Sequence, residues 1–208
     1  ANENHDHSDS FLAGTEIEYA FGNHRSFYDC LNNIICTLHR IYQPGVPNLP
    51  DSFRKIAGKT ENHLETVYKF PQPIITYYKT REETFLKLRS IRDNIFHHGH
   101  SPDTLFKFDD GFAIAIDDQF AKQLGALNLW SEDILKPNRL GSVLPVFAYL
   151  VRDMLDAMNH LGETVLGCFQ NPPTQIAAGH QVFLRSPISK HLVSLDRYLK
   201  EQWFNPRT

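Results

Sequence analysis

Three long stretches with helical periodicity, separated by segments rich in proline and glycine, constrain most strongly what this chain can fold into. Apolar residues recur three and four positions apart in residues 11–42, 73–98 and 142–166. That spacing places side chains on one face of an α-helix. The segment 43–51, with three prolines and a glycine, cannot continue a helix. We therefore expect a mainly α protein, a helical bundle of four to five main helices.

The periodicity also predicts which face of each helix is buried. In the first helix the predicted apolar stripe is Phe27, Leu31, Ile34, Leu38 and Ile41. In the second it is Ile74, Ile75, Tyr78, Phe85, Leu88, Ile91 and Ile95. In the third it is Leu144, Phe147, Val151, Met154, Leu155, Met158, Leu161 and Val165, with Asp153, Asp156, His160 and Glu163 on the opposite, polar side.

Local signals place the remaining elements. Residues 105–117 alternate apolar and polar side chains around Asp-Asp-Gly, which predicts a small inserted β-hairpin. The segment 135–141, which contains Lys-Pro-Asn-Arg, is expected to be a linker, and Ser142 to cap the helix that follows. Short helices are expected from Asp51 or Ser52 to Ala57, from Thr60 onward, and over residues 189–203, after a loop at 170–180. Residues 1–10 are predicted to be disordered and residues 11–208 to form a single domain.

Composition narrows the function. The net charge of −3 and the pI near 6.4 provide no overall basic field, so non-specific duplex binding is not expected to be the main role. The three cysteines have no framework spacing, which favours free thiols in a reducing, cytoplasmic compartment. No apolar run reaches the length of about 18 residues that a membrane span needs, so no membrane partner is expected.

The end of the second long helix, residues 89–100, reads RSIRDNIFHHGH and holds the most unusual pattern in the chain. Arg92 falls inside the apolar arc between Leu88 and Phe96, where a guanidinium is costly unless it is paired or meets an anion. Asp93 and His97 are four residues apart and therefore neighbours on the helix surface. The helix C-terminus and a nearby carboxylate both favour a positive charge at this position, so His97 is a candidate to give or take a proton.

This combination suits phosphodiester chemistry without a metal. A histidine can move the proton of a ribose 2′-hydroxyl or of the leaving oxygen. An arginine can hold the negative charge that develops on a five-coordinate phosphorus. Structural interpretations stay open, because Arg92 can instead extend its charged head to water or pair with an internal carboxylate, and His97 can act as a helix cap.

The stretch RDNIFHHG resembles the Arg-x4-His motif of the HEPN (higher eukaryotes and prokaryotes nucleotide-binding) superfamily, in which a polar residue such as Asp93 often follows the arginine. The resemblance implies a bundle of four or five helices and, in many members, a metal-independent endoribonuclease whose active site forms where two domains meet. It implies that Arg92 stabilises the transition state, that His97 is the acid or base, and that Asp93 orients His97. Other members are non-catalytic modules that bind nucleotide, RNA or protein.

Three further residues, His98, Arg89 and Tyr78, are candidate RNA-binding residues, Tyr78 because an aromatic ring can stack on a base. No cofactor is expected. A metal site is not expected either, because His97 and His98 point about 100° apart and no Asp, Glu or Cys beside them completes a ligand set. The expected partners are RNA or a nucleotide, a second copy of the chain in a homodimer, and a protein partner such as an antitoxin.

Overall fold

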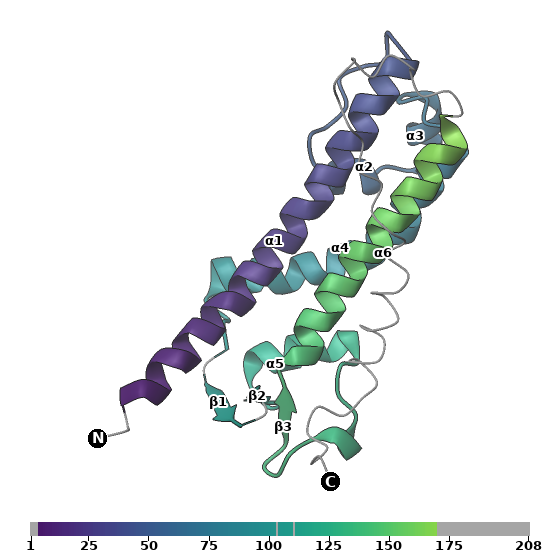
Figure 1. The fold of residues 1–208 in the computed structure, drawn as a ribbon. Helices are drawn as coiled ribbons and strands as arrows, with labels where there is room; N and C mark the ends of the chain where they lie inside the picture. The colour runs from purple at the N-terminus through teal and green to yellow at the C-terminus, as the bar shows by residue number, and fades with distance from the viewer. Residues whose placement is uncertain (1–3, 103, 110, 170–208) are drawn as a thin grey trace, which may run out of the picture. The chain divides into compact units, whose positions relative to one another are not determined.

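The computed structural model describes residues 4–102, 104–109 and 111–169, and Figure 1 traces the order of the elements. The protein is mainly α, a helical bundle with a small β insertion, as the sequence predicts. The described helices are α1 (Asn4–Tyr42), α2 (Phe53–Ala57), α3 (Glu61–Thr66), α4 (Gln72–His98), α5 (Gln119–Leu124) and α6 (Leu144–Cys168). The strands are β1 (Leu105–Phe108), β2 (Gly111–Ala115) and β3 (Leu140–Ser142), with short 3₁₀ helices η1 (Gly125–Leu127) and η2 (Glu132–Ile134) before β3.

The contacts divide the described chain into two compact units. The first, here the sheet unit, holds α1 as far as Ser26 together with Phe85–Asp153. The second, here the helical unit, holds Phe27–Thr84 and α6 from Met154. The helices α1, α4 and α6 each contribute residues to both units. None of the helices in the described part of the chain combines the length and the apolar character needed to cross a bilayer.

The boundaries of the helices agree with the sequence signals in most places. The helix α4 is followed by Gly99 in the left-handed conformation, with a φ of 66°, as its position predicts. Thr60 caps α3, because its hydroxyl accepts a hydrogen bond from the backbone N–H of His63. The helix α1 begins at Asn4, so residues 4–10, expected to be disordered, form its first turns. The predicted loop at 170–180 and helix at 189–203 lie outside the described residues.

The predicted hairpin is present, but the sheet is larger than the sequence suggests. Strands β1 and β2 pair antiparallel, with Leu105 opposite Ile114 and Phe108 opposite Gly111. The segment expected to be a linker instead turns through Asn138 and Arg139, both at positive φ, and forms β3, which pairs antiparallel with β2. A strand of three residues is too short to carry an alternating pattern, so no sequence signal marks it.

The apolar face of α4 is buried as predicted. All seven residues of its predicted stripe are at most 4% exposed. Its C-terminal part packs in the core of the sheet unit, where Phe21 and Phe120 meet edge to face at 6.1 Å. Its N-terminal part lies in an aromatic core of the helical unit, where Phe53 packs against Tyr28 and Tyr78 with ring centroids 4.9 and 5.1 Å away.

The buried faces of α1 and α6 differ from the predicted stripes. On α1, Ile34 is 48% exposed, and the buried line is instead Ile17, Phe21, His24, Tyr28, Leu31, Ile35 and His39. On α6, Val151 is exposed, and the buried line is Val146, Leu150, Asp153, Ala157, Leu161 and Thr164. Both lines keep helical spacing, but polar residues occupy positions along them, so counting apolar residues selects a neighbouring face.

The polar residues on these two faces meet inside the sheet unit. The ring Nε2 of His24 lies 2.8 Å from the carboxylate of Asp153, and the two side chains are 3% and 9% exposed. Asp153, predicted to lie on the polar side of its helix, is therefore a core residue. Burial of either group is tolerable because each is hydrogen bonded to the other.

We predict that His24→Ala lowers the free energy of unfolding by about 1–3 kcal/mol, because a buried carboxylate loses a hydrogen bond. Urea unfolding at pH 7 measures the change. Asn23→Ala, at the exposed neighbouring position, is the matched control and should shift the value by less than about 0.5 kcal/mol. Equal stability of His24→Ala and the natural chain would contradict a stabilising role for the pair.

Candidate functional site: an arginine cluster near the end of α4

Three charged side chains form a cluster on the last three turns of α4. Arg89 Nε donates to one oxygen of Asp93 at 3.1 Å, and an NH of Arg92 donates to the other at 2.8 Å. The side chains of Arg89, Arg92 and Asp93 are 20%, 19% and 30% exposed. Two guanidinium groups thus share one carboxylate, which leaves one net positive charge within reach of solvent.

Arg92 lies at the edge of the core rather than within it. Its guanidinium carbon is 4.8 Å from the ring centroid of Phe96, in a cation–π contact. Phe96 is half exposed and faces Gly22 of α1, where an added Cβ would lie 3.6 Å from the ring. The Nε atom of Arg92 is buried and has no hydrogen-bond partner among the described residues. One donor of this arginine is therefore unsatisfied in the free chain.

Asp93 is held in its charged form by the two arginines. Partial burial acts to raise its pKa, but the hydrogen bond from Arg92 and the charges of Arg89 and Arg92 outweigh burial and hold the pKa below its ordinary value. Both oxygens of Asp93 are engaged with arginine. In the described part of the chain, no hydrogen bond or ion pair joins Asp93 to His97. The carboxylate implied as the orienting group for His97 is therefore turned to the arginines.

The histidines at the end of α4 lie on the surface. His97 and His98 are exposed, and the rings of His98 and His100 are 5.9 Å apart. The His100 ring is within hydrogen-bond distance of the Gln119 side-chain nitrogen, at 3.1 Å. Among the residues that the structure describes, no three His, Cys, Asp or Glu side chains are grouped so that they could hold a metal ion. The candidate site residues that the structure brings into contact are thus Arg89, Arg92 and Asp93.

Tyr78 does not belong to this site. It lies in the helical unit, is fully buried, and its hydroxyl donates to Asn32 Oδ1 at 2.9 Å. Burial holds its pKa well above the ordinary tyrosine value. A ring without exposed surface cannot stack on a base, so the prediction that Tyr78 binds RNA is wrong. Its place in the apolar stripe of α4 was the signal for a core role.

Another ion pair, which no sequence motif predicts, joins two helices within the helical unit. Arg81 of α4 binds both the side chain of Asp156, at 2.7 Å, and its backbone carbonyl oxygen, at 3.1 Å. Burial, and then the charge of Arg81, lower the pKa of the neighbouring His160. The pair joins α4 to α6, which gives it a structural role in the packing of the two helices.

Comparison of the chain with protein-family models, curated proteins and solved structures gave no match. No comparison therefore tests the resemblance to HEPN domains, which stays an expectation from the motif between Arg92 and His97.

We predict that Asp93→Asn destabilises the protein at pH 7 and that the difference from the natural chain narrows as the pH falls below about 4. Because the folded-state pKa of Asp93 lies below its ordinary value of 3.8, the charged carboxylate is the stabilising form. The stabilisation that the charged Asp93 carboxylate gives the folded state is fully present above its ordinary pKa of 3.8. It is lost as the pH falls through the lower pKa that Asp93 has in the folded state. Thermal melting from pH 7 to pH 3 measures it.

Ser90→Ala is a suitable control for this series, since the exposed Ser90 on the same helix does not titrate. Its difference in melting temperature from the natural chain should stay constant with pH. If the difference in melting temperature between Asp93→Asn and the natural chain is as large at pH 3 as at pH 7, the charged Asp93 carboxylate is not the stabilising form.

Proposed function

We propose that this protein is a HEPN-like, metal-independent endoribonuclease that cleaves RNA phosphodiester bonds with Arg92 and His97. The observation that carries the proposal is the surplus positive charge of the arginine cluster, on the same helix as the exposed His97, which follows Arg92 by five residues. A phosphate oxygen can accept a hydrogen bond from the part of the Arg92 side chain that solvent reaches, since that side chain is 19% exposed. A phosphodiester provides the acceptor and the negative charge together.

The proposed reaction needs one proton to leave the ribose and one to reach the leaving group. The 2′-hydroxyl gives its proton to a histidine, its oxygen forms a bond to phosphorus, and the bond from phosphorus to the 5′-oxygen breaks. The 5′-oxygen takes a proton from a second acid. Arg92 stabilises the extra charge on the five-coordinate phosphorus. These are the roles that the HEPN resemblance implies for the two residues.

A homodimer completes this proposal. One chain supplies one His97, whereas the reaction uses a base and an acid. A second copy, placed with its α4 end near the first, brings another histidine and another arginine pair to the same phosphate. Dimerisation of this kind follows from the HEPN resemblance, and the exposure of His97 on the helix end is compatible with it.

A second candidate is a non-catalytic HEPN-like module that binds RNA, a nucleotide or a protein partner such as an antitoxin. The position of Asp93 favours it, because a carboxylate bound to Arg89 and Arg92 does not orient His97 for proton transfer. In that case the arginine cluster binds an anion and no bond is broken.

We expect Arg92→Ala to reduce cleavage of an unstructured RNA by two or more orders of magnitude, about 3 kcal/mol of barrier, because the arginine acts on the transition state. His97→Ala should have a comparable effect, and the double variant should lose little more, since both act on one step. EDTA should leave cleavage by the natural chain intact. Folding stability should change little, because Arg89 still pairs with Asp93 in Arg92→Ala.

Arg54→Ala, which removes an exposed arginine of the helical unit, is the matched control and should cleave as the natural chain does. If the natural chain binds RNA without cleaving it, and Arg92→Ala weakens binding and its dependence on salt, the binding module replaces the enzyme. If Arg92→Ala neither cleaves less nor binds more weakly, the cluster has no role in RNA recognition.

Sedimentation of the purified protein at micromolar concentration should show two chains per particle, as a site shared between two α4 ends requires. Specific cleavage activity should fall on dilution below the concentration at which the particles dissociate. If a strictly monomeric protein cleaves RNA at full rate, the active site is not shared between two chains. The roles of Arg92 and His97 are then tested by their variants alone.

A further inference from the structure

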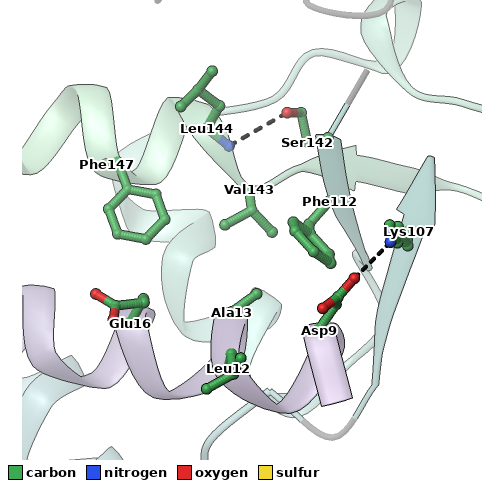
Figure 2. Close-up of a pocket in the computed structure, with 11 residues that line it drawn as sticks. Asp9, Leu12, Ala13, Glu16, Lys107, Phe112, Ser142, Val143, Leu144 and Phe147 are labelled. Carbon is green, nitrogen blue, oxygen red and sulfur yellow. Dashed lines mark hydrogen bonds and ion pairs between the residues drawn. The ribbon is translucent and has the colours of Figure 1, made fainter. Parts of the chain in front are cut away.

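The sheet unit contains a cavity of about 530 Å³ between the first turns of α1, the hairpin and the start of α6 (Figure 2). Its volume falls within the range of about 300–1,000 Å³ that is typical of sites for small molecules. The walls are built from apolar side chains of all three segments: Leu12, Ala13, Phe112, Val143, Leu144 and Phe147. Leu12 is 57% exposed although it lies on this wall, so the free chain leaves a large apolar side chain partly in water.

The charged groups of the cavity lie on its rim. Asp9 and Lys107 form an ion pair at 2.6 Å, so these two charges offset each other. Glu16 lies on the same helix seven residues further on, about 10 Å along the helix axis, and Figure 2 shows it at the other end of the row formed by Leu12 and Ala13. Glu16 is exposed and has no ion pair in the described part of the chain. Outside the pair of Asp9 and Lys107, Glu16 is the one charged residue among the described residues that line the cavity, so its carboxylate offers a negative charge there.

The start of α6 also borders the cavity, but its backbone N–H groups already donate hydrogen bonds within the chain. The N–H of Val143 donates to Phe112 O at 2.9 Å, and that of Leu144 to the hydroxyl of Ser142 at 3.3 Å. Pro145 has no N–H, and the N–H of Val146 donates to Val143 O at 3.0 Å. Helix starts attract anions mainly through unpaired N–H groups. The N–H groups of these four residues are bonded or missing, so the start of α6 does not attract an anionic ligand to the cavity.

We propose that this cavity binds an apolar small molecule that carries a single cationic group, such as a long-chain amine or ammonium compound. The apolar body lies among Leu12, Phe112 and Phe147, and the cation lies beside Glu16. Burial of the apolar walls provides most of the affinity, and the carboxylate selects the sign of the charge. This binding site is separate from the arginine cluster and does not depend on RNA cleavage.

Isothermal titration of the full chain with three probes of equal chain length tests the proposal: dodecylammonium, dodecanol and dodecanoate, each below the concentration at which it aggregates. We expect one saturable site for dodecylammonium, about tenfold weaker binding of dodecanol, and weaker binding still of dodecanoate. Dodecanoate that binds as tightly as dodecylammonium would overturn the assignment of charge. Absence of saturable binding for all three would overturn the site.

Two variants locate the binding. Glu16→Gln should bring the affinity for dodecylammonium down to that for dodecanol, and Glu65→Gln, an exposed glutamate of the helical unit, should leave it unchanged. Ala13→Phe fills the cavity and should abolish binding of both probes, with melting curves to show that it folds. If Ala13→Phe does not fold, Glu16→Gln decides the matter, because its exposed carboxylate can be neutralised without disturbing the core. Unchanged discrimination between the two probes in Glu16→Gln would refute the proposal.

Discussion

The hydrogen bond between His24 and Asp153 is the constraint on which the packing of the sheet unit depends. Each residue lies in the middle of the buried face of a long helix, and neither can be buried there without a polar partner. Meeting that need sets how α1 and α6 are rotated and aligned within this unit. The same alignment places Ile17 and Phe21 in one core with Val146 and Leu150. It also brings the first turns of both helices to the cavity.

The charged groups of the arginine cluster also need polar partners, but they lie at the surface, where water can solvate part of their charge. Asp93 satisfies Arg89 and Arg92 together, and the ring of Phe96 covers one side of the Arg92 guanidinium. Two cations with one carboxylate are tolerable because each side chain is about one-fifth to one-third exposed. An interior position would demand full neutralisation. The charge that remains is the reason for proposing a phosphate ligand.

Prediction from the sequence was most accurate where the buried residues are all apolar. The stripe of α4 was correct throughout, and its end at Gly99 was correct because only a residue tolerant of positive φ fits there. The stripes of α1 and α6 were correct only in part, for example at Leu31 and Leu161, because polar residues occupy positions on the faces that are buried. For the site, the sequence placed Arg92, Asp93 and His97 on one stretch of helix. It did not predict that Asp93 would bind the arginines in preference to His97, since all are within reach on the helix surface.

By itself the sequence determined the features that depend on neighbours within about four residues: the three long helices, the breaks between them, the hairpin, and the arginine and histidine near the end of α4. Periodicity and turn chemistry act over that range, so they are readable without the rest of the chain. Only the tertiary structure decided which polar residues were buried, where β3 paired, that Tyr78 was a core residue, and that a cavity opened beside Glu16. Each of these depends on segments more than twenty residues apart in the chain meeting in space, and a single helix or strand pattern does not specify its partner.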